Sequence, residues 1–431
     1  MAGKTGYKAA LLPLVLIISL FFLWGMANNL NDILIKQFKK AFILTDLQTG
    51  FVQSAFYMGY FLLAIPAGLT MRRHGYKSAV VVGLILYGIG ALLFYPAAQY
   101  STYGMFLAAL FVIASGLAFL ETAANPLVTV LGDPARSEQR LNLAQSFNPV
   151  GSIVGLYIGK VFILSGIERD EAQLAGMSAA DQTAFYTRET LAVAPPYVAI
   201  GLFVLAWAAI VALTRFPEVA TRRSQDAADQ LGWSQALRGV FGKKPLLFAV
   251  IAQFFYVGAQ VGVWSYTIRY AQAAAGLNET AAADWVIAAL ATFMIGRFVG
   301  SWLMGRVNPA RLLGAYATIN VALALVAAAT GGLVGLVALT ALSFFMSIMF
   351  PTIFALGVKD LGPYTQTGAS LIVMAIIGGA VLTPAMGAVS TYVSINMAML
   401  VPAGCFVSVA FYALFNLRRA DTIDVSGAAG H

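Results

Sequence analysis

The sequence has almost none of the residues on which disulfides, metal sites and nucleophilic triads depend. Its 431 residues include one cysteine, Cys405, and two histidines, His74 and His431. A single cysteine excludes an intrachain disulfide, and two histidines leave little basis for His-ligated metal or Ser–His chemistry. The sequence contains no HExxH motif. We therefore expect a protein that is not an enzyme and that has neither a metal nor an organic cofactor.

Charged residues are also scarce. They make up 10% of the chain, and hydrophobic residues make up 60%. A soluble domain carries about 25% charged and about 45–50% apolar residues. Spans of about 20 apolar residues, enough to cross a bilayer twelve times, would use most of the hydrophobic residues and leave no room for a separate soluble domain. The expected partner is the lipid bilayer, and nucleic acid is excluded.

Long hydrophobic runs separated by charged or turn-rich breaks fill the chain and predict an all-α membrane protein with twelve transmembrane helices. The predicted helices are 11–36, 48–71, 78–97, 104–131, 141–165, 195–214, 246–274, 283–305, 312–330, 332–357, 367–390 and 394–415. Two long breaks separate these spans, the linker 215–245 and the segment 166–194. They are predicted on opposite sides of the membrane, and we expect the segment 166–194 to be partly helical.

The distribution of the basic residues predicts the orientation. Most of the 26 lysines and arginines fall in breaks on one side of the predicted membrane. They are Lys4, Lys8, Arg72, Arg73, Lys77, Arg136, Arg140, those of 215–245, Arg306, Arg311, Lys359, Arg418 and Arg419. Cytoplasmic loops carry the excess of Lys and Arg, so both termini are predicted to be cytoplasmic. The net charge of +8 thus has a topological cause.

The spans divide into two groups of six that look related. The polar segment 215–245 separates a predicted N-terminal six-helix bundle (1–214) from a C-terminal six-helix bundle (246–431). Pro126 and Gly132 in the fourth span recur with the same spacing as Pro351 and Gly357 in the tenth. Gly151 of the fifth span aligns in the same way with Gly378 of the eleventh. Two homologous bundles are therefore expected.

Two acidic residues fall well inside predicted spans, Asp32 in the first and Glu121 in the fourth. A charged carboxylate near the bilayer centre costs about 2.5–3.5 kcal/mol even on the translocon scale. Such a residue must be paired, hydrated or neutral part of the time, which is the requirement for a group that takes up and releases a proton. A structural hydrogen bond within the bundle is the alternative for each acid.

Several amide side chains accompany the two acids. Asn29 shares the helix face of Asp32, Asn125 follows Glu121 by one turn, and Gln145 and Asn148 lie three residues apart. Pro126 also frees the carbonyl of Thr122 beside Glu121. Buried amides suit a ligand with many hydroxyl groups, although hydrogen bonds between helices could equally explain each one.

The seventh span carries a polar and aromatic face. Its members recur at helical spacing and are Gln253, Tyr256, Gln260, Trp264 and Thr267. Amides would bind sugar hydroxyls and rings would cover the C–H face of a pyranose; an aromatic packing stripe is the alternative. Arg297 lies deep in the eighth span, where it could pair with backbone carbonyls or act as an interior switch.

These segments resemble one known family. The relevant motifs are FFLWGMANNLNDIL (21–34), LETAANPLVTVLG (120–132), RLNLAQSFN (140–148), YVGAQVGVWSYTIRYA (256–271), PTIFALGVKDLG (351–362) and IVMAIIGGAVLTPAMG (372–387). They are similar to those of the fucose–proton symporter family of the major facilitator superfamily, over nearly the whole chain. The resemblance implies a multi-pass bacterial inner-membrane carrier that imports L-fucose or a related sugar with a proton by alternating access.

The resemblance also implies roles for residues. Asp32 and Glu121 would be the essential carboxylates, with Asp32 leaning to proton coupling and Glu121 to sugar recognition. The sugar cavity would be lined by Asn29, Glu121, Asn125, Gln145, Asn148, Tyr256, Gln260 and Trp264. Met349 and Phe350 depart from the family pattern, where a polar residue and a tyrosine are expected. This change removes a phenol hydroxyl near the cavity.

Other functions remain open at this point. A glucose/galactose or N-acetylglucosamine symporter of the same family would have the same acids, and a drug–proton antiporter would also use buried carboxylates. The many amides argue against the antiporter, since lipophilic compounds favour apolar walls. A sugar sensor that binds without transporting is a further alternative. We expect a monomer whose ligands are a sugar and a proton.

Overall fold

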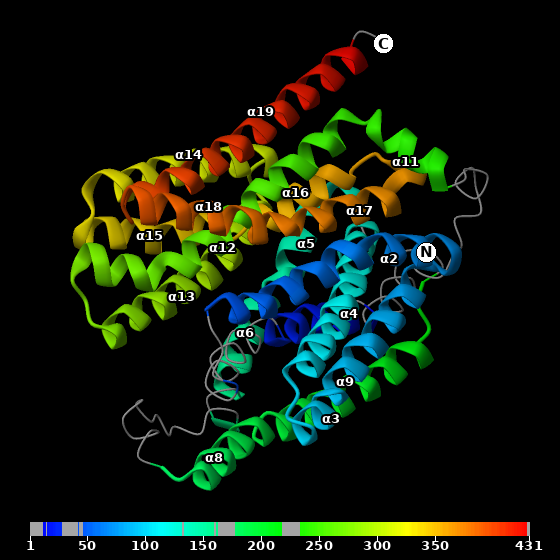
Figure 1. Cartoon of the computed structure of the whole chain (residues 1–431). Coiled ribbons are helices and arrows are strands. Elements are labelled where there is room, and N and C mark those ends of the chain that lie inside the picture. Colours follow the sequence, from blue (N-terminus) through cyan, green and yellow to red (C-terminus); the bar gives the residue numbers. More distant parts are fainter. Residues whose placement is uncertain are drawn as a thin grey trace. The chain divides into compact units, whose positions relative to one another are not determined.

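The computed structural model describes residues 12–13, 15–27, 42, 46–131, 133–158, 161–162, 177–217 and 233–428, and these are almost entirely helical (Figure 1). The described chain forms two compact units. Unit 1 comprises residues 1–124 and 147–222, and unit 2 comprises residues 125–146 and 223–431.

Unit 1 holds the helices of the first half of the chain, apart from the segment 125–146. They are an apolar helix at Val15–Ala27, α2 (Asp46–Leu92), α3 (Phe94–Gln99), most of α4 (Tyr103–Val130), α6 (Phe147–Ile158), α8 (Ala179–Leu191) and α9 (Ala194–Leu213). The helix α8 confirms that the segment 166–194 is partly helical. Its first residue follows Ser178, whose hydroxyl accepts a hydrogen bond from the backbone N–H of Asp181 and caps the helix.

Unit 2 contains the end of α4, the short turn η1 (Pro134–Arg136), α5 (Ser137–Gln145) and the helices of the second half. These are α11 (Trp233–Phe241), α12 (Lys244–Ala275), α13 (Glu279–Leu303), α14 (Pro309–Thr330), α15 (Gly332–Met346), α16 (Met349–Val358), α17 (Thr365–Met374), α18 (Gly378–Tyr392) and α19 (Leu400–Ala428), with three 3₁₀ turns, η3 (Gly362–Tyr364), η4 (Ala375–Ile377) and η5 (Met397–Met399). Asn278 and Asn308 cap the starts of α13 and α14.

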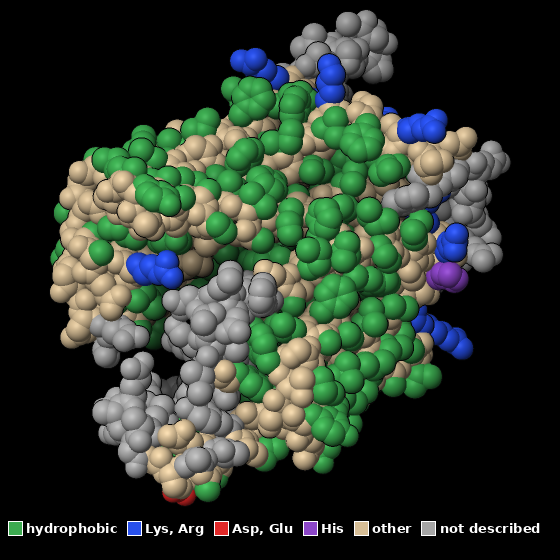
Figure 2. All heavy atoms as spheres, in the orientation of Figure 1, with side chains coloured by type: hydrophobic (Ala, Val, Ile, Leu, Met, Phe, Trp, Pro, Cys, Tyr) green, Lys and Arg blue, Asp and Glu red, His purple; other side chains and the backbone are tan. Residues whose placement is uncertain are grey.

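The helices account for the spans predicted from the sequence. Within the described residues, nine helical stretches are long and apolar enough to cross a membrane. One of them contains two spans, because α2 is broken at Gly75, which has φ 82° and ψ 169°. The helix Val15–Ala27 and the pair α5 and α6 represent the first and fifth spans. Figure 2 shows hydrophobic side chains over much of the surface in view, with a few lysines and arginines, most of them near its margin.

Several of the predicted spans are interrupted, which the hydrophobic pattern does not predict; the third, for example, breaks at Leu93 between α2 and α3. The fifth span breaks at Ser146 between α5 and α6, the tenth between α15 and α16, and the eleventh at η4. Proline is the physical reason in two cases. Pro149 and Pro351 have no N–H, so they cannot bond to the carbonyls of Gln145 and Ser347 four residues earlier.

The same close contact occurs once in each unit. In unit 1, the Cα of Gly151 lies so near the backbone carbonyl of Phe22 that a Cβ atom would overlap it. In unit 2, Gly378 lies in the same way against the carbonyl of Phe254. Each contact joins the first and the fifth span of its half. Both aligned positions therefore need a glycine for the same reason, which is the close approach of a backbone carbonyl.

Candidate functional site

The predicted site residues fall into three groups. Asp32 and Asn29 lie outside the described residues, so their places in the site remain predictions. Glu121 and Asn148 belong to unit 1, and Asn125, Gln145, Tyr256, Gln260 and Trp264 belong to unit 2. The described residues are therefore taken below one unit at a time.

Glu121 is a fully enclosed carboxylate. Its residue is 1% exposed on α4, and neither carboxylate oxygen has a hydrogen-bond partner among the described residues. The Thr122 hydroxyl beside it is likewise buried and unpartnered within that part of the chain. The neighbouring α2 brings the buried side chain of Tyr60 close enough to interact electrostatically with Glu121. An unpartnered buried carboxylate is expensive to maintain, which is typical of a group that binds a ligand or a proton.

Asn125 and Gln145 form a pair inside unit 2. The side-chain amide of Gln145 donates to the side-chain oxygen of Asn125 at 2.8 Å, and both residues are buried. The side-chain N–H₂ of Asn125 has no acceptor among the described residues. A buried donor left over from such a pair could bond to a hydroxyl-bearing ligand.

Asn148 is separated from Gln145 by the helix break at Ser146. The sequence spacing predicts that the two amides point together from one helix, but α5 ends at Gln145 and α6 begins at Phe147. Asn148 is half-buried, and its backbone carbonyl accepts from the hydroxyl of Ser152. Because Gln145 belongs to unit 2 and Asn148 to unit 1, the expectation that their amides point together stays a prediction.

The polar face of α12 is partly occupied by neighbouring helices. The Tyr256 hydroxyl donates to the carbonyl of Met346 at 2.9 Å, and the Trp264 indole N–H donates to the hydroxyl of Ser343 at 3.2 Å. Both contacts fix α12 against α15. Gln260 is half-buried, whereas Gln253 is fully buried and neither of its amide atoms has a partner among the described residues. Gln253 is thus a stronger candidate for a ligand-binding residue than its place in the sequence suggested.

Arg297 confirms the expectation that it pairs with backbone carbonyls. The residue is 4% exposed on α13, and its guanidinium lies 4.6 Å from the ring centroid of Phe293. Nε donates to the carbonyl of Ser347 at 2.7 Å and Nη1 to that of Gln145 at 2.9 Å. These are the two carbonyls that receive no N–H from Pro351 and Pro149. The guanidinium of Arg297 therefore supplies the missing hydrogen-bond donors at both helix breaks.

The start of α5 carries an ion pair. The Glu138 carboxylate accepts from the ammonium of Lys359 and from the hydroxyl of Ser137, each at 2.9 Å. One turn later, the Asn142 amide donates to the hydroxyl of Thr352 at 3.1 Å. Glu138, Asn142 and Gln145 thus lie on one face of α5 and bind it to α16 and α13. Among the described residues, no group of three or more His, Cys, Asp or Glu side chains could hold a metal ion.

Comparisons with known proteins place the chain in a family. The model of the Major Facilitator Superfamily matches residues 14–382. The chain belongs to the Major Facilitator Superfamily. It is 46% identical to the L-fucose-proton symporter of Escherichia coli (strain K12) over 97% of this chain and 96% of that protein. It is 37% identical to the glucose/galactose transporter of Brucella abortus, again over 97% of this chain and 96% of that protein.

A solved structure of this superfamily agrees with the fold. The transporter FucP, crystallised in an outward conformation, matches with a TM-score of 0.88 and 47% identity, covering 94% of this chain and 99% of that one. The resemblance stated from the motifs and the twelve-helix architecture are thereby confirmed. So is the expectation of a carrier, since these relatives are transporters and not enzymes.

Proposed function

We propose that this chain is a proton-coupled symporter that imports L-fucose, or a sugar of closely related stereochemistry, by alternating access. The observation that carries the proposal is the enclosed, unpartnered carboxylate of Glu121 in a chain whose relatives include sugar–proton symporters. The buried amide pair Asn125–Gln145, with its free donor, supports a ligand with hydroxyl groups. Drug export would require apolar walls and is disfavoured by this arrangement.

In this proposal Glu121 binds sugar hydroxyls and Asp32 carries the coupling proton. Asn29, Asn125, Gln145, Asn148, Tyr256, Gln260 and Trp264 are the further proposed sugar contacts. Because Tyr256 and Trp264 already donate their hydrogen bonds to α15, they would offer the sugar their ring faces. No cofactor is needed, since the proton supplies the driving force. The carrier would act as a monomer in the bacterial inner membrane with both termini cytoplasmic.

The test of the substrate is counterflow of radiolabelled L-fucose in proteoliposomes, with unlabelled sugars as competitors. We expect competition by L-fucose and its stereochemical relatives. Competition by glucose or galactose with none by fucose would overturn the assignment of the sugar and favour the function of the Brucella relative. The side chain of Phe350, which is buried and lacks a hydroxyl, would then be the first residue to exchange.

The test of the carboxylate is the variant Glu121→Gln, which keeps the shape of the side chain and removes its charge. We expect it to abolish sugar binding in detergent and sugar-dependent alkalinisation of the medium. Asp284→Asn, at an exposed carboxylate on α13, is the matched control and should transport normally. Sugar binding retained with uptake lost would make Glu121 a coupling residue, and normal uptake would remove it from the site.

The test of proton coupling uses Asp32→Asn in the same proteoliposomes. We expect sugar-dependent alkalinisation to be lost. Alkalinisation that survives in this variant would show that the transported proton is carried elsewhere, and Glu121 would then be the remaining buried candidate.

A further inference from the structure

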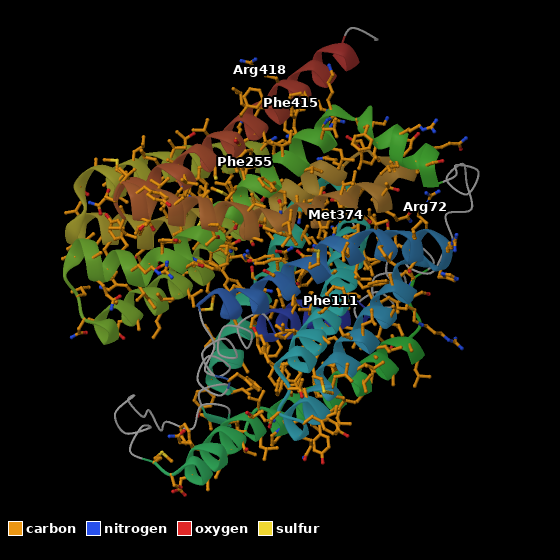
Figure 3. All side chains as sticks on the ribbon, in the orientation of Figure 1. Arg72, Phe111, Phe255, Met374, Phe415 and Arg418 are labelled. Atoms are coloured by element: carbon orange, nitrogen blue, oxygen red, sulfur yellow. The ribbon has the colours of Figure 1, made fainter. Side chains whose placement is uncertain are left out.

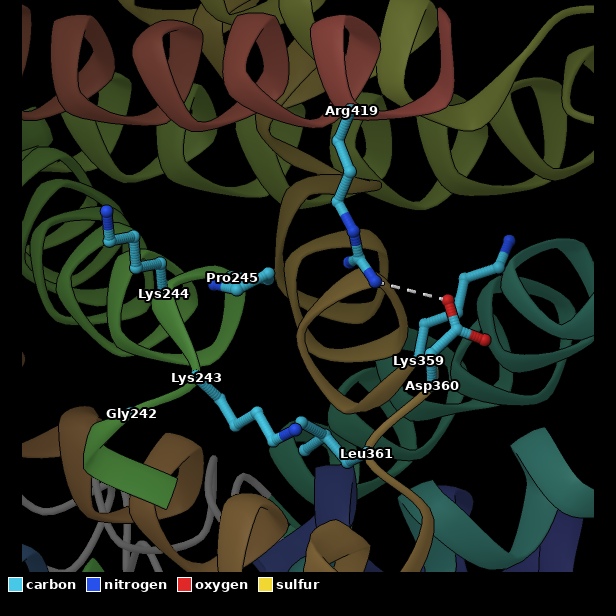
Figure 4. Close-up of a pocket in the computed structure, with 8 residues that line it drawn as sticks. All are labelled: Gly242, Lys243, Lys244, Pro245, Lys359, Asp360, Leu361 and Arg419. Carbon is cyan, nitrogen blue, oxygen red and sulfur yellow. Dashed lines mark hydrogen bonds and ion pairs between the residues drawn. The ribbon is translucent and has the colours of Figure 1, made fainter. Parts of the chain in front are cut away.

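A basic pocket lies within unit 2 and, apart from Lys359, is lined by residues other than those described above. It has a volume of about 290 Å³ and is lined by the start of α12, the loop after α16 and one residue of α19 (Figure 4). The lining residues are Gly242, Lys243, Lys244, Pro245, Lys359, Asp360, Leu361 and Arg419. The volume is near the lower end of small-ligand pockets, about 300–1,000 Å³.

The charges of the pocket do not balance. Lys359 is paired with Glu138 at 2.9 Å, and Arg419 is paired with Asp360 at 3.3 Å. Lys243 and Lys244 have no carboxylate partner among the described residues; the Lys243 ammonium lies 5.6 Å from the ring centroid of Tyr364. Within the part of the chain that the structure describes, two positive charges are therefore left without a counterion. The positive end of the α12 dipole, which begins at Lys244, adds to them.

The pocket lies at the level where spans end. The span of α12 begins at Lys244, the span containing α16 ends at Val358, and the span containing α19 ends at Arg419. All three segments therefore meet at one end of their helices, where lipid headgroups are found. The distribution of lysines and arginines predicts this end to be cytoplasmic, the side on which basic pockets between helices bind anionic headgroups.

An apolar surface continues from the pocket along the helices toward the bilayer core. Phe411 and Phe415 lie two turns and one turn before Arg419 on α19, and both rings contact Phe248 of α12, at centroid distances of 6.1 and 4.8 Å. Phe411 and Leu414 are exposed. Figure 3 labels Phe415 and Arg418 near this end of α19. A molecule bound in the pocket would thus have a surface on which acyl chains can lie.

We propose that this pocket binds the phosphate group of an anionic phospholipid, whose acyl chains lie along Phe248, Phe411 and Phe415. The phosphate would take the place of the missing counterion for Lys243 and Lys244. The lipid is favoured over a free phosphate ion because the cationic residues and the exposed apolar surface adjoin each other. This binding is independent of the sugar site and of the proposed substrate.

The experiment is native mass spectrometry of the purified full chain, titrated with phosphatidylglycerol or with phosphatidylcholine of the same acyl chains. We expect phosphatidylglycerol to bind preferentially. Since a lysine near the surface of an anionic membrane contributes about 1 kcal/mol, the variant Lys243→Gln/Lys244→Gln should bind it roughly thirtyfold more weakly. Lys244→Gln alone, at an exposed side chain, should weaken binding about fivefold, and serves if the double variant does not fold.

The matched control is Arg306→Gln/Arg311→Gln, which removes two exposed positive charges elsewhere in unit 2 at the same predicted membrane face. Its affinity for phosphatidylglycerol should stay within about twofold of the unmodified protein. Three results would overturn the proposal: equal losses in the control and pocket variants, equal binding of the two lipids, or an unchanged affinity in the pocket variants. Full displacement of the lipid by millimolar inorganic phosphate would show a site for free anions and would also overturn it.

Discussion

Replacing Arg297 by methionine tests whether one side chain holds the two proline-broken helices in place. The substitution removes the donors to the carbonyls of Gln145 and Ser347, and the prolines at 149 and 351 prevent the backbone from replacing them. Hydrogen bonds to charged groups contribute about 1.5–3 kcal/mol each. Part of this loss of stability is offset, because the variant no longer has the free-energy cost of desolvating a buried guanidinium.

From these terms we expect the Arg297→Met protein to be less stable by about 2–4 kcal/mol. For a unit of this size, that loss corresponds to a fall in the melting temperature on the order of 10 °C. The melting temperature of Arg297→Lys should lie between those of the unmodified protein and Arg297→Met. An ammonium group lacks the planar fork of the guanidinium that reaches both carbonyls.

The assay is thermal unfolding of the purified variants in one detergent, followed by sugar counterflow. The matched control is Arg269→Met, which removes an exposed arginine that lies 5.1 Å from the ring of Tyr266 and makes no hydrogen bond comparable to those of Arg297 among the described residues. Equal melting temperatures for Arg297→Met and Arg269→Met would refute the reasoning, since the two orphaned carbonyls would then need no donor.

Two further predictions concern packing and charge. Lys359→Gln should destabilise the protein by about 1–3 kcal/mol, because the carboxylate of Glu138 is 2% exposed and would lose its cation. In thermal unfolding, the double variant Glu138→Gln/Lys359→Gln should recover part of that loss. A double variant no more stable than Lys359→Gln would contradict the stabilising role of the ion pair. Gly151→Ala and Gly378→Ala should each cost about 1–3 kcal/mol through overlap with a backbone carbonyl, whereas Gly404→Ala, with open space around its Cα, should not; equal melting temperatures for all three would contradict the close approach.

The sequence predicted the spans better than the contacts. Hydrophobic runs and span length are local properties, so the boundaries of α4, α9 and α14 follow from composition. Pro149 and Pro351 are visible in the sequence and predict orphaned carbonyls, but which donor satisfies them depends on packing across unit 2. The burial of Glu121 followed from its position within a run. That Tyr256 and Trp264 donate to α15 could not follow from α12 alone.

The basic pocket shows the same limit. Each of its segments could be recognised as the end of a span, and the excess of lysine and arginine there was counted as a signal of orientation. That residues 243, 360 and 419 meet around one cavity depends on contacts between elements far apart in the chain. The number of charged residues along a sequence does not predict which of them come together in the folded protein.

Three of the polar contacts of α5 differ in how strongly dissolved salt acts on them. The bond from Asn142 to Thr352 joins two neutral groups, and Arg297 donates to the neutral carbonyl of Gln145. The contact of Glu138 with Lys359 joins two opposite charges, and the lysine side chain is 46% exposed. High salt would therefore weaken the attachment of the first turn of α5 more than that of its last turn.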